Sequence, residues 1–206
     1  MESYEVIKRL SEEIAQSISK ELNSSFDKEY INTIIKKIAE LLRNTKFGKN
    51  FFIDKFEITK GANKDNERLF YVKGSFYQHN TCAAVYYAFN SKGEYVGCVK
   101  AEVENLVPPT QVEMEYWAAE EHKNKGNMTV LARDVINEIF VDRLFDGFKI
   151  RDGLPTSNIN SIMVAINADN YASLAVARKL GFDADGILRI DDYYKQIEEE
   201  PSIKSG

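Results

Sequence analysis

The chain has 206 residues, of which 44% are hydrophobic and 29% charged, and its net charge is −5. This balance is that of a folded globular protein with one domain, or one domain and an appendage. The negative charge argues against a general nucleic-acid binder, which needs a cationic surface against phosphates. No window holds the about 18 consecutive apolar residues of a membrane span, and the start of the chain lacks a secretory pattern. We therefore expect a cytoplasmic protein that does not act at a membrane.

Residues 1–47 predict a helical hairpin that is packed on the rest of the chain or appended to it. Apolar residues recur at steps of three and four on either side of the polar Asn23-Ser24-Ser25. They are Ile7, Leu10, Ile14, Ile18 and Leu22, followed by Ile31, Ile34, Ile35, Ile38, Leu41 and Leu42. Both stripes are interpreted as packing surfaces.

Residues 48–198 predict an α+β domain, and residues 199–206 a frayed tail. Strands are expected over Phe51–Thr59, Leu69–Tyr77, Ala83–Phe89, Tyr95–Val103, Val112–Ala118 and Ser161–Ile166. Helices are expected from Gly126 to Leu144 and over Tyr171–Leu180, with a polar loop over 147–160 and a final strand or hairpin over Gly186–Tyr194. This order favours a mixed, mostly antiparallel twisted sheet flanked by helices.

One chemistry-bearing segment, residues 120–129, joins a predicted strand to a strongly patterned helix and contains Lys123, Lys125 and Gly126. A helix start presents unpaired backbone N–H groups and the positive end of the helix dipole, and a glycine lets the backbone approach a ligand closely. These features favour a pyrophosphate site. For this segment alone, an ordinary basic loop before a helix is the simpler explanation.

A second segment, residues 167–182, predicts a helix that Asp169 or Asn170 caps and that Gly181 ends. Ser173 falls in the first turn, where its hydroxyl either faces a cleft or bonds back to a carbonyl group. Taken alone, this is an ordinary helix.

The two segments together resemble the GNAT superfamily of acyl-CoA-dependent N-acyltransferases, and within it the branch that acetylates the N-termini of ribosomal proteins. The branch's later motif, Asn-x-x-Ser-x-x-Val-x-x-Lys-x-Gly-Phe, is matched in full by residues 170–182, and its pyrophosphate loop in part by residues 123–128. Glu115-Tyr116-Trp117 is similar to the branch's Gly-Tyr-Trp. The resemblance covers residues 112–189 and implies acetyl-CoA as the donor and an amine as the acceptor.

Several positions depart from the family pattern. Lys123 replaces Gln or Arg, Glu115 replaces glycine, and the tyrosine that many relatives use as a general acid falls on Ala177. Met128 replaces a small residue, and its larger side chain is expected to narrow the pyrophosphate site while its amide is kept. The cofactor contacts implied by the resemblance are Trp117, Ala118, Lys123, Asn124, Lys125, Gly126, Asn127, Met128, Thr129, Asn170 and Ser173.

The reaction that the resemblance implies is direct acetyl transfer to a primary amine, which belongs to a protein N-terminus, a lysine or a small molecule. Such amines have pKa values of about 8 to 10 and must lose a proton before they attack. Glu115 or Glu113, on one face of a predicted strand, is the candidate base; an exposed side chain or an ion pair is the competing explanation for each. The N–H groups near Trp117 and Ala118 are expected to polarise the thioester carbonyl, and the resemblance implies that Ser173 hydrogen-bonds the leaving thiolate.

No metal site is expected from the sequence. Cys82 and Cys98 are the only cysteines, and their spacing matches no zinc pattern. His79 and His122 lie far apart in the chain. The cysteines are expected as reduced, partly buried thiols rather than a disulfide.

The N-terminal half departs from the usual family order, in which one strand precedes two helices. Here two predicted helices come first, and the link from Thr59 to Leu69 is too short for another pair. The hairpin either replaces the helices that wall the acceptor site, which we favour slightly, or serves as an appendage for dimerisation or partner binding. A homodimer is compatible with either arrangement. The competing function is a non-catalytic GNAT-like module that binds acyl-CoA or a partner protein.

Overall fold

The computed structural model describes residues 51–78, 81–92, 94–104, 110–146, 149–150, 154–155 and 159–199. The helical hairpin predicted over residues 1–47 lies outside these ranges, as do residues 200–206 of the predicted tail. The proposed domain boundary at residue 48 therefore stays a prediction.

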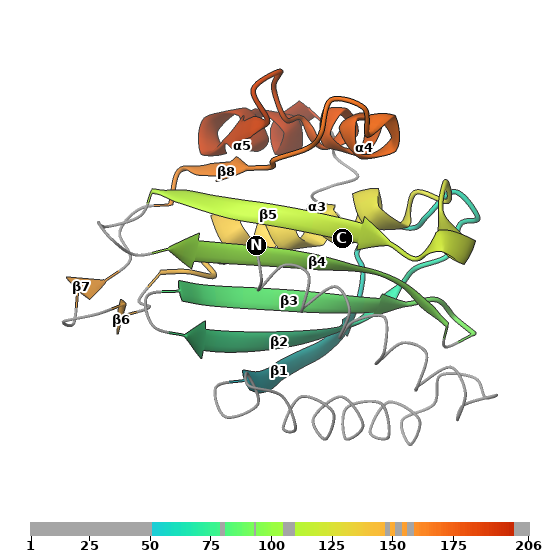
Figure 1. Cartoon of the computed structure of the whole chain (residues 1–206), viewed down its shortest axis with the longest axis horizontal. Helices are drawn as coiled ribbons and strands as arrows, with labels where there is room; N and C mark the ends of the chain where they lie inside the picture. Colours follow the sequence, from blue (N-terminus) through green and yellow to red (C-terminus); the bar gives the residue numbers. More distant parts are fainter. Residues whose placement is uncertain are drawn as a thin grey trace.

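A seven-stranded sheet forms the body of the described structure, in the order β1-β2-β3-β4-β5-β8-β9 (Figure 1). Its strands are β1 Phe51–Ile58, β2 Phe70–Gln78, β3 Thr81–Phe89, β4 Tyr95–Glu104, β5 Gln111–Ala118, β8 Ser161–Met163 and β9 Ile187–Arg189. Neighbours are antiparallel except β5 and β8, which run parallel. The prediction of a mixed, mostly antiparallel sheet is confirmed.

Three α-helices and one short 3-10 helix accompany the sheet. They are η1 Glu120–His122, α3 Asn127–Phe140, α4 Tyr171–Leu180 and α5 Ile190–Glu199. Figure 1 shows α3 behind β4 and β5, and α4 and α5 together beyond β8. The polar loop predicted over residues 147–160 instead contains a small antiparallel pair, β6 Lys149–Ile150 with β7 Leu154–Pro155.

The hydrophobic core lies between α3 and one face of the sheet. Alternate residues of β4 and β5, including Val99, Ala101 and Met114, are fully buried against the apolar side of α3, which includes Leu131 and Val135. The side-chain period of two along a strand explains why these residues share one face. The intervening residues of β4 and β5 therefore project from the opposite face of the sheet.

One predicted helix boundary was wrong, and one helix was not predicted. Helix α3 ends at Phe140 and not at Leu144, because Arg143 adopts a left-handed conformation with φ 56° and the Leu144 N–H turns back to the Glu138 carbonyl oxygen. The prediction of a final strand or hairpin over Gly186–Tyr194 holds only for β9. Helix α5 begins directly after β9 and buries Tyr193, whose hydroxyl lies 2.9 Å from Asn137 Oδ1.

The connection between β1 and β2 contains turns and bends but no helix, as its length predicted. Buried Thr59 holds its two ends together, since its Oγ1 accepts the Leu69 N–H at 3.0 Å and its N–H donates to the Leu69 carbonyl oxygen at 2.8 Å. Asn63 organises the middle, where its Oδ1 accepts the N–H groups of Asp65 and Glu67 at 3.0 Å. The connection is therefore an ordered loop, and it reaches the candidate site.

Candidate functional site

The parallel strands β5 and β8 separate part of the way along β5. Their ladder pairs Gln111–Glu113 with Ser161–Met163 and goes no further, whereas β5 stays paired with β4 up to Ala118. Beyond Glu113, the edge of β5 that faces away from β4 therefore has no strand partner among the described residues. Its backbone groups are available for a ligand.

Alternation along β5 decides which backbone groups face that open edge. Ala119 donates its N–H to the Val96 carbonyl oxygen at 2.9 Å, toward β4. Since successive peptide groups of a strand point to opposite sides, the N–H of Trp117 also points toward β4, while those of Tyr116 and Ala118 point to the open edge. Of the two residues predicted to present N–H groups to a thioester, Ala118 has the suitable orientation.

The loop that follows β5 ends at the start of α3 in a backbone geometry that suits an anion. Gly126 is the N-cap residue with φ 78°, and no side chain caps the helix. Its carbonyl oxygen accepts the Val130 N–H at 3.2 Å, so the N–H groups before Val130 lie in the first turn, where a helix has no internal partners for them. A positive φ is a conformation that glycine adopts without strain.

The side chain of Met128 points into the core and away from this first turn. It is 5% exposed and belongs to the hydrophobic core. A Cβ added to Gly97 of β4 would come within 2.8 Å of the Met128 Sδ atom, so the thioether lies directly on that glycine. The expected narrowing of the pyrophosphate site by Met128 is therefore not supported by the direction of its side chain.

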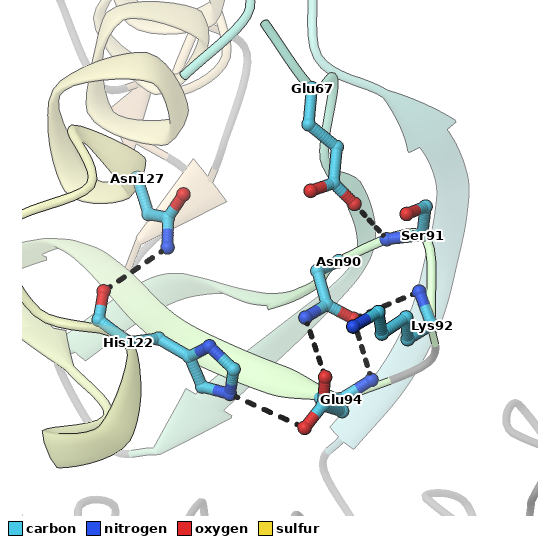
Figure 2. A network of polar contacts seen from close by, with 7 residues as sticks. All are labelled: Glu67, Asn90, Ser91, Lys92, Glu94, His122 and Asn127. Carbon is cyan, nitrogen blue, oxygen red and sulfur yellow. Dashed lines mark hydrogen bonds and ion pairs between the residues drawn. The ribbon is translucent and has the colours of Figure 1, made fainter. Parts of the chain in front are cut away.

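The side chain of Asn127 holds the loop before α3 in place through hydrogen bonds. It is buried, and its amide nitrogen lies 3.3 Å from the His122 carbonyl oxygen (Figure 2). Its Oδ1 accepts a hydrogen bond of 2.9 Å from Asn63 of the β1–β2 connection. The N–H of Lys64 adds a second link, 2.8 Å to the Lys125 carbonyl oxygen. Two separate loops thus fix the position of the α3 N-terminus.

The β3–β4 turn joins the same network, as Figure 2 shows. Glu94 lies between Asn90, whose Nδ2 is 3.0 Å from Glu94 Oε1, and His122, whose Nε2 is 3.8 Å from Glu94 Oε2. The Ser91 N–H donates to Glu67 at 2.6 Å, which ties the turn to the β1–β2 connection. Hydrogen bonds with Ser91 hold the pKa of Glu67 below its usual range.

Helix α4 begins and ends as the sequence predicted. Asn170, and not Asp169, is the N-cap, and its Oδ1 accepts the Ser173 N–H at 3.2 Å. Gly181 ends the helix with φ 95°. The hydroxyl of Tyr116 on β5 donates to the Ser173 carbonyl oxygen at 2.6 Å, and burial raises the pKa of Tyr116 to about 12. This bond joins β5 to the first turn of α4 across the open edge.

The opposite face of β4 and β5 carries a cluster of four charged side chains. The ladder places Lys100 opposite Glu115 and Glu102 opposite Glu113. The Lys100 Nζ atom lies 3.4 Å from Glu102 Oε1 and 3.6 Å from Glu115 Oε2. Lys100 is only 1% exposed, which makes it one of the largest fully buried side chains. The side chain of Glu115 is 18% exposed.

Glu115 has a buried oxygen with unused hydrogen-bonding capacity. Its Oε2 has no hydrogen-bond partner in the described structure, since the Lys100 ion pair is longer than a hydrogen bond. Burial raises the pKa of the Glu115 carboxyl group, Glu102 and Glu113 raise it further, and Lys100 opposes them. This combination is typical of a group that exchanges protons.

The three carboxylates also have a geometry that a cation fits, because oxygens of Glu102, Glu113 and Glu115 lie within 4.8 Å of one another. The Lys100 ammonium already contacts two of the three. The chain thus supplies an internal counter-ion to this cluster.

The structure brings the predicted residues together in two groups. The cofactor residues of the loop and α3, from Lys123 to Thr129, adjoin the end of β5, and Tyr116 links β5 to Ser173. Glu113 and Glu115 share the other face with Lys100. The sequence interpretation missed Tyr116 and Lys100. A lysine and a glutamate on neighbouring strands can indicate an ion pair. The pairing register of β4 and β5, which puts Lys100 opposite Glu115, was needed to identify it.

Two further findings bear on the sequence expectations. Cys82 and Cys98 are both buried as thiols, without a disulfide between them. No helix in the described ranges is both long enough and apolar enough to cross a membrane.

Comparisons with known proteins identify the family. The sequence model of the acetyltransferase (GNAT) domain matches residues 38–183, which is more than half of the 206 residues. No protein of curated function matches the chain.

The solved structures that resemble the chain are acetyltransferases with low sequence identity. The spermidine/spermine N-acetyltransferase SpeG from Vibrio cholerae is 13% identical, with 55% of this chain and 70% of that chain covered and a TM-score of 0.43. RimL, a ribosomal alpha-N-protein acetyltransferase in complex with coenzyme A, is 21% identical, with 48% of each chain covered and a TM-score of 0.37. A ribosomal-protein alanine acetyltransferase from Vibrio fischeri is 20% identical, with 49% and 48% covered and a TM-score of 0.40.

The chain spans about half the length of the last two proteins. The family assignment rests on the domain match. The chain belongs to the GNAT family of acetyltransferases.

Proposed function

We propose that the chain transfers an acetyl group from acetyl-CoA directly to a primary amine, with Glu115 accepting the proton of that amine. The acceptor is a protein N-terminus, a lysine side chain or a small amine. The observation that carries the proposal is the buried Oε2 atom of Glu115, which has no hydrogen-bond partner among the described residues. It belongs to the part of β5 that has left β8.

The residues around the start of α3 fit the pyrophosphate of acetyl-CoA. Uncapped N–H groups of the first turn, a glycine at the N-cap and the cations Lys123 and Lys125 suit a doubly charged anion. The Met128 side chain points into the core, which leaves room beside its amide. Asn124, Asn127 and Thr129 complete the segment that would hold the cofactor.

The open edge of β5 fits the extended arm of the cofactor, because its backbone groups lack a strand partner. Acetyl-CoA, when bound, supplies the activated acetyl thioester. The Ala118 N–H, directed to that edge, would polarise the thioester carbonyl. Ser173, in the first turn of α4, would donate a hydrogen bond to the leaving sulfur, and Asn170 holds that turn in place.

The proposed base and the proposed hydrogen-bond donor to the sulfur lie on opposite faces of β5. Glu115 projects from one face, and Tyr116 from the other, toward α4. A base on one side of the strand and Ser173 on the other allow an amine to lose its proton on one face while the sulfur leaves on the opposite face. Such separation prevents the base and the leaving group from competing for one position.

Glu115 is preferred over Glu113 as the base for a positional reason. Glu113 lies where β5 is still paired with β8 through Met163, so its backbone is enclosed by strands on both sides. Glu115 lies two residues further along the same face, beyond the end of that pairing. The proposal therefore has the acceptor amine approach Glu115 from the side of the open edge.

The test compares Glu115→Gln with Glu113→Gln in steady-state acetylation of an α-amino peptide, a lysine peptide and a diamine. Loss of a general base reduces the rate by about 10²–10⁴-fold. We expect Glu115→Gln to lower kcat/KM by at least about 100-fold at neutral pH, with partial recovery at high pH, where the amine loses its proton unaided. Glu113→Gln serves as the matched control and should retain most of the activity. Equal rates for wild type and Glu115→Gln at every pH would remove Glu115 as the base.

A further inference from the structure

Lys100 is a buried cation at the centre of the charged cluster on β4 and β5. It is 1% exposed, and its ammonium lies between Glu102 at 3.4 Å and Glu115 at 3.6 Å. Lysine is seldom buried without a partner, because an ammonium is strongly hydrated in water. Its position therefore requires that at least one of these carboxylates be ionised.

The groups that act on Glu115 come from two strands. Lys100 and Glu102 face it from β4, and Glu113 lies two residues away on β5. The neighbouring strand β3 adds no charge, since Ala83 and Val85 stand opposite Glu102 and Lys100. Among the described residues, Lys100 is thus the cation that acts on Glu115, against two like charges.

We propose that Lys100 is a positioning residue that keeps the Glu115 carboxylate ionised and directed along β5, and that Glu102 competes with Glu115 for the same ammonium. This inference deepens the proposed function and rests on it for the catalytic consequence. The contact between Lys100 and Glu115 is an ion pair without a hydrogen bond. It favours the charged form of Glu115 yet leaves Oε2 able to accept a proton.

The two partners of Lys100 predict opposite effects. Removal of the ammonium leaves Glu115 buried beside two carboxylates, which favours its neutral form. An opposite charge within about 4–6 Å lowers a carboxyl pKa by about 1–3 units, so Lys100→Met should raise the pKa of Glu115 by about one unit or more. Glu102→Gln removes a repelling charge and releases the ammonium to Glu115, so it should lower that pKa. Shifts of opposite sign would show that each charge acts on Glu115, whereas a general disruption of the cluster would shift the pKa of Glu115 in the same direction in both variants.

The direct measurement is the titration of Glu115 by NMR with ¹³C-labelled glutamate, in the full chain without substrate. The Glu115→Gln variant identifies the signal. Lys100→Arg, which keeps the charge, should return the pKa toward that of wild type. Lys73→Met is the matched control, since Lys73 pairs with Glu138 at 3.4 Å on the opposite face of the sheet, and it should leave the titration of Glu115 unchanged.

The acid limb of kcat/KM against pH gives the second readout and separates this inference from the proposed function. Shifts upward in Lys100→Met and downward in Glu102→Gln, seen in both measurements, support both. Shifts of the NMR titration without movement of the acid limb would retain the role of Lys100 and refute Glu115 as the base. An unmoved titration in Lys100→Met and in Glu102→Gln would overturn the inference. If Lys100→Met does not fold, Lys100→Gln takes its place, and an unmoved titration of Glu115 in that variant would overturn the inference.

Discussion

At the scale of single residues, Met128 shows how one large side chain is accommodated beside a binding loop. Its thioether lies on Gly97 of β4, where any Cβ would collide with it and with the Trp117 carbonyl oxygen. Met128 and Gly97 are thus complementary in size, as close packing of a core requires. The amide of Met128 stays in the first turn of α3, available to a ligand.

This arrangement predicts that Met128→Ala changes stability but not cofactor binding. Loss of a buried methionine side chain costs about 2–5 kcal/mol, and we expect a decrease of that size in the free energy of unfolding in urea. The Kd for coenzyme A, measured by calorimetry, should stay within about twofold of wild type, since the amide geometry is kept. Gly126→Val is the contrasting variant, because its φ of 78° strains a branched side chain, and it should weaken binding by about tenfold or more. A gain in affinity for Met128→Ala would restore the idea that this side chain narrows the site.

At the scale of elements, the β1–β2 connection is attached to α3 at two separate places. Near the N-terminus of the helix, Asn63 bonds to Asn127 at 2.9 Å. Two turns further on, the Lys60 N–H lies 3.1 Å from Asp134 Oδ2. Burial raises the pKa of Asp134 to about 6, and the bond from Lys60 only partly opposes that rise. The second attachment therefore contains a buried carboxylate whose ionised form lowers the stability of the fold.

Asp134 consequently predicts a pH-dependent difference in stability. Its folded-state pKa lies above the unfolded value near 3.9, so the folded state binds more protons than the unfolded state between about pH 4 and pH 6, and the free energy of unfolding falls as the pH rises through that range. Asp134→Asn keeps an oxygen for the Lys60 N–H and removes the charge. We expect the free energy of unfolding of this variant to exceed that of wild type by about 1–3 kcal/mol at pH 7 to 8. The difference should disappear as the pH falls from 6 to 4.

Asp183 provides a control of opposite sign. It is exposed, and hydrogen bonds from the Ile187 N–H and from Arg189 hold its pKa below the usual range. Asp183→Asn should therefore be less stable than wild type at neutral pH, with the difference lost as the pH falls through the acidic range. Urea denaturation at a series of pH values measures both variants. If the free energies of unfolding of Asp134→Asn and wild type depended on pH in the same way, the raised pKa would not belong to Asp134.

At the scale of the whole molecule, the proposed cofactor site is assembled from segments that are distant in sequence. The β1–β2 connection, the β3–β4 turn, the loop before α3 and the first turn of α4 all adjoin β5 or its extension (Figures 1 and 2). The site exists only when these segments are folded together. A ligand bound there should therefore stabilise the whole domain.

The expected thermal stabilisation follows from mass action. A ligand that binds only the folded state at a hundredfold excess over its Kd adds about 2.7 kcal/mol to the free energy of unfolding. Acetyl-CoA should raise the melting temperature in a differential scanning experiment, and pantetheine, which lacks the pyrophosphate, should raise it less. Absence of any shift at millimolar acetyl-CoA would refute the enzyme proposal and favour a GNAT-like partner-binding module.

Local patterns in the sequence predicted much of this fold. Segments rich in aromatic and β-branched residues indicated β1 to β3, and the helix α4 could be delimited by a cap at Asp169 or Asn170 and by its terminal Gly181, because each of these signals is contained within a few residues. The helix α5 was missed although Ile190, Tyr193 and Ile197 recur at helical spacing, because β9 continues into it without a break.

The sequence by itself determined the family and the order of the strands along the chain, and it suggested the segments that we propose for cofactor binding. It placed Glu113 and Glu115 on one face because side chains alternate along a strand. Only the tertiary structure decided that Lys100 lies against Glu115, that Tyr116 holds the first turn of α4, and that the Met128 side chain packs on Gly97 in the core. The physical reason is that these contacts depend on strand register and helix packing, which are fixed by many residues together and cannot be read from any local pattern.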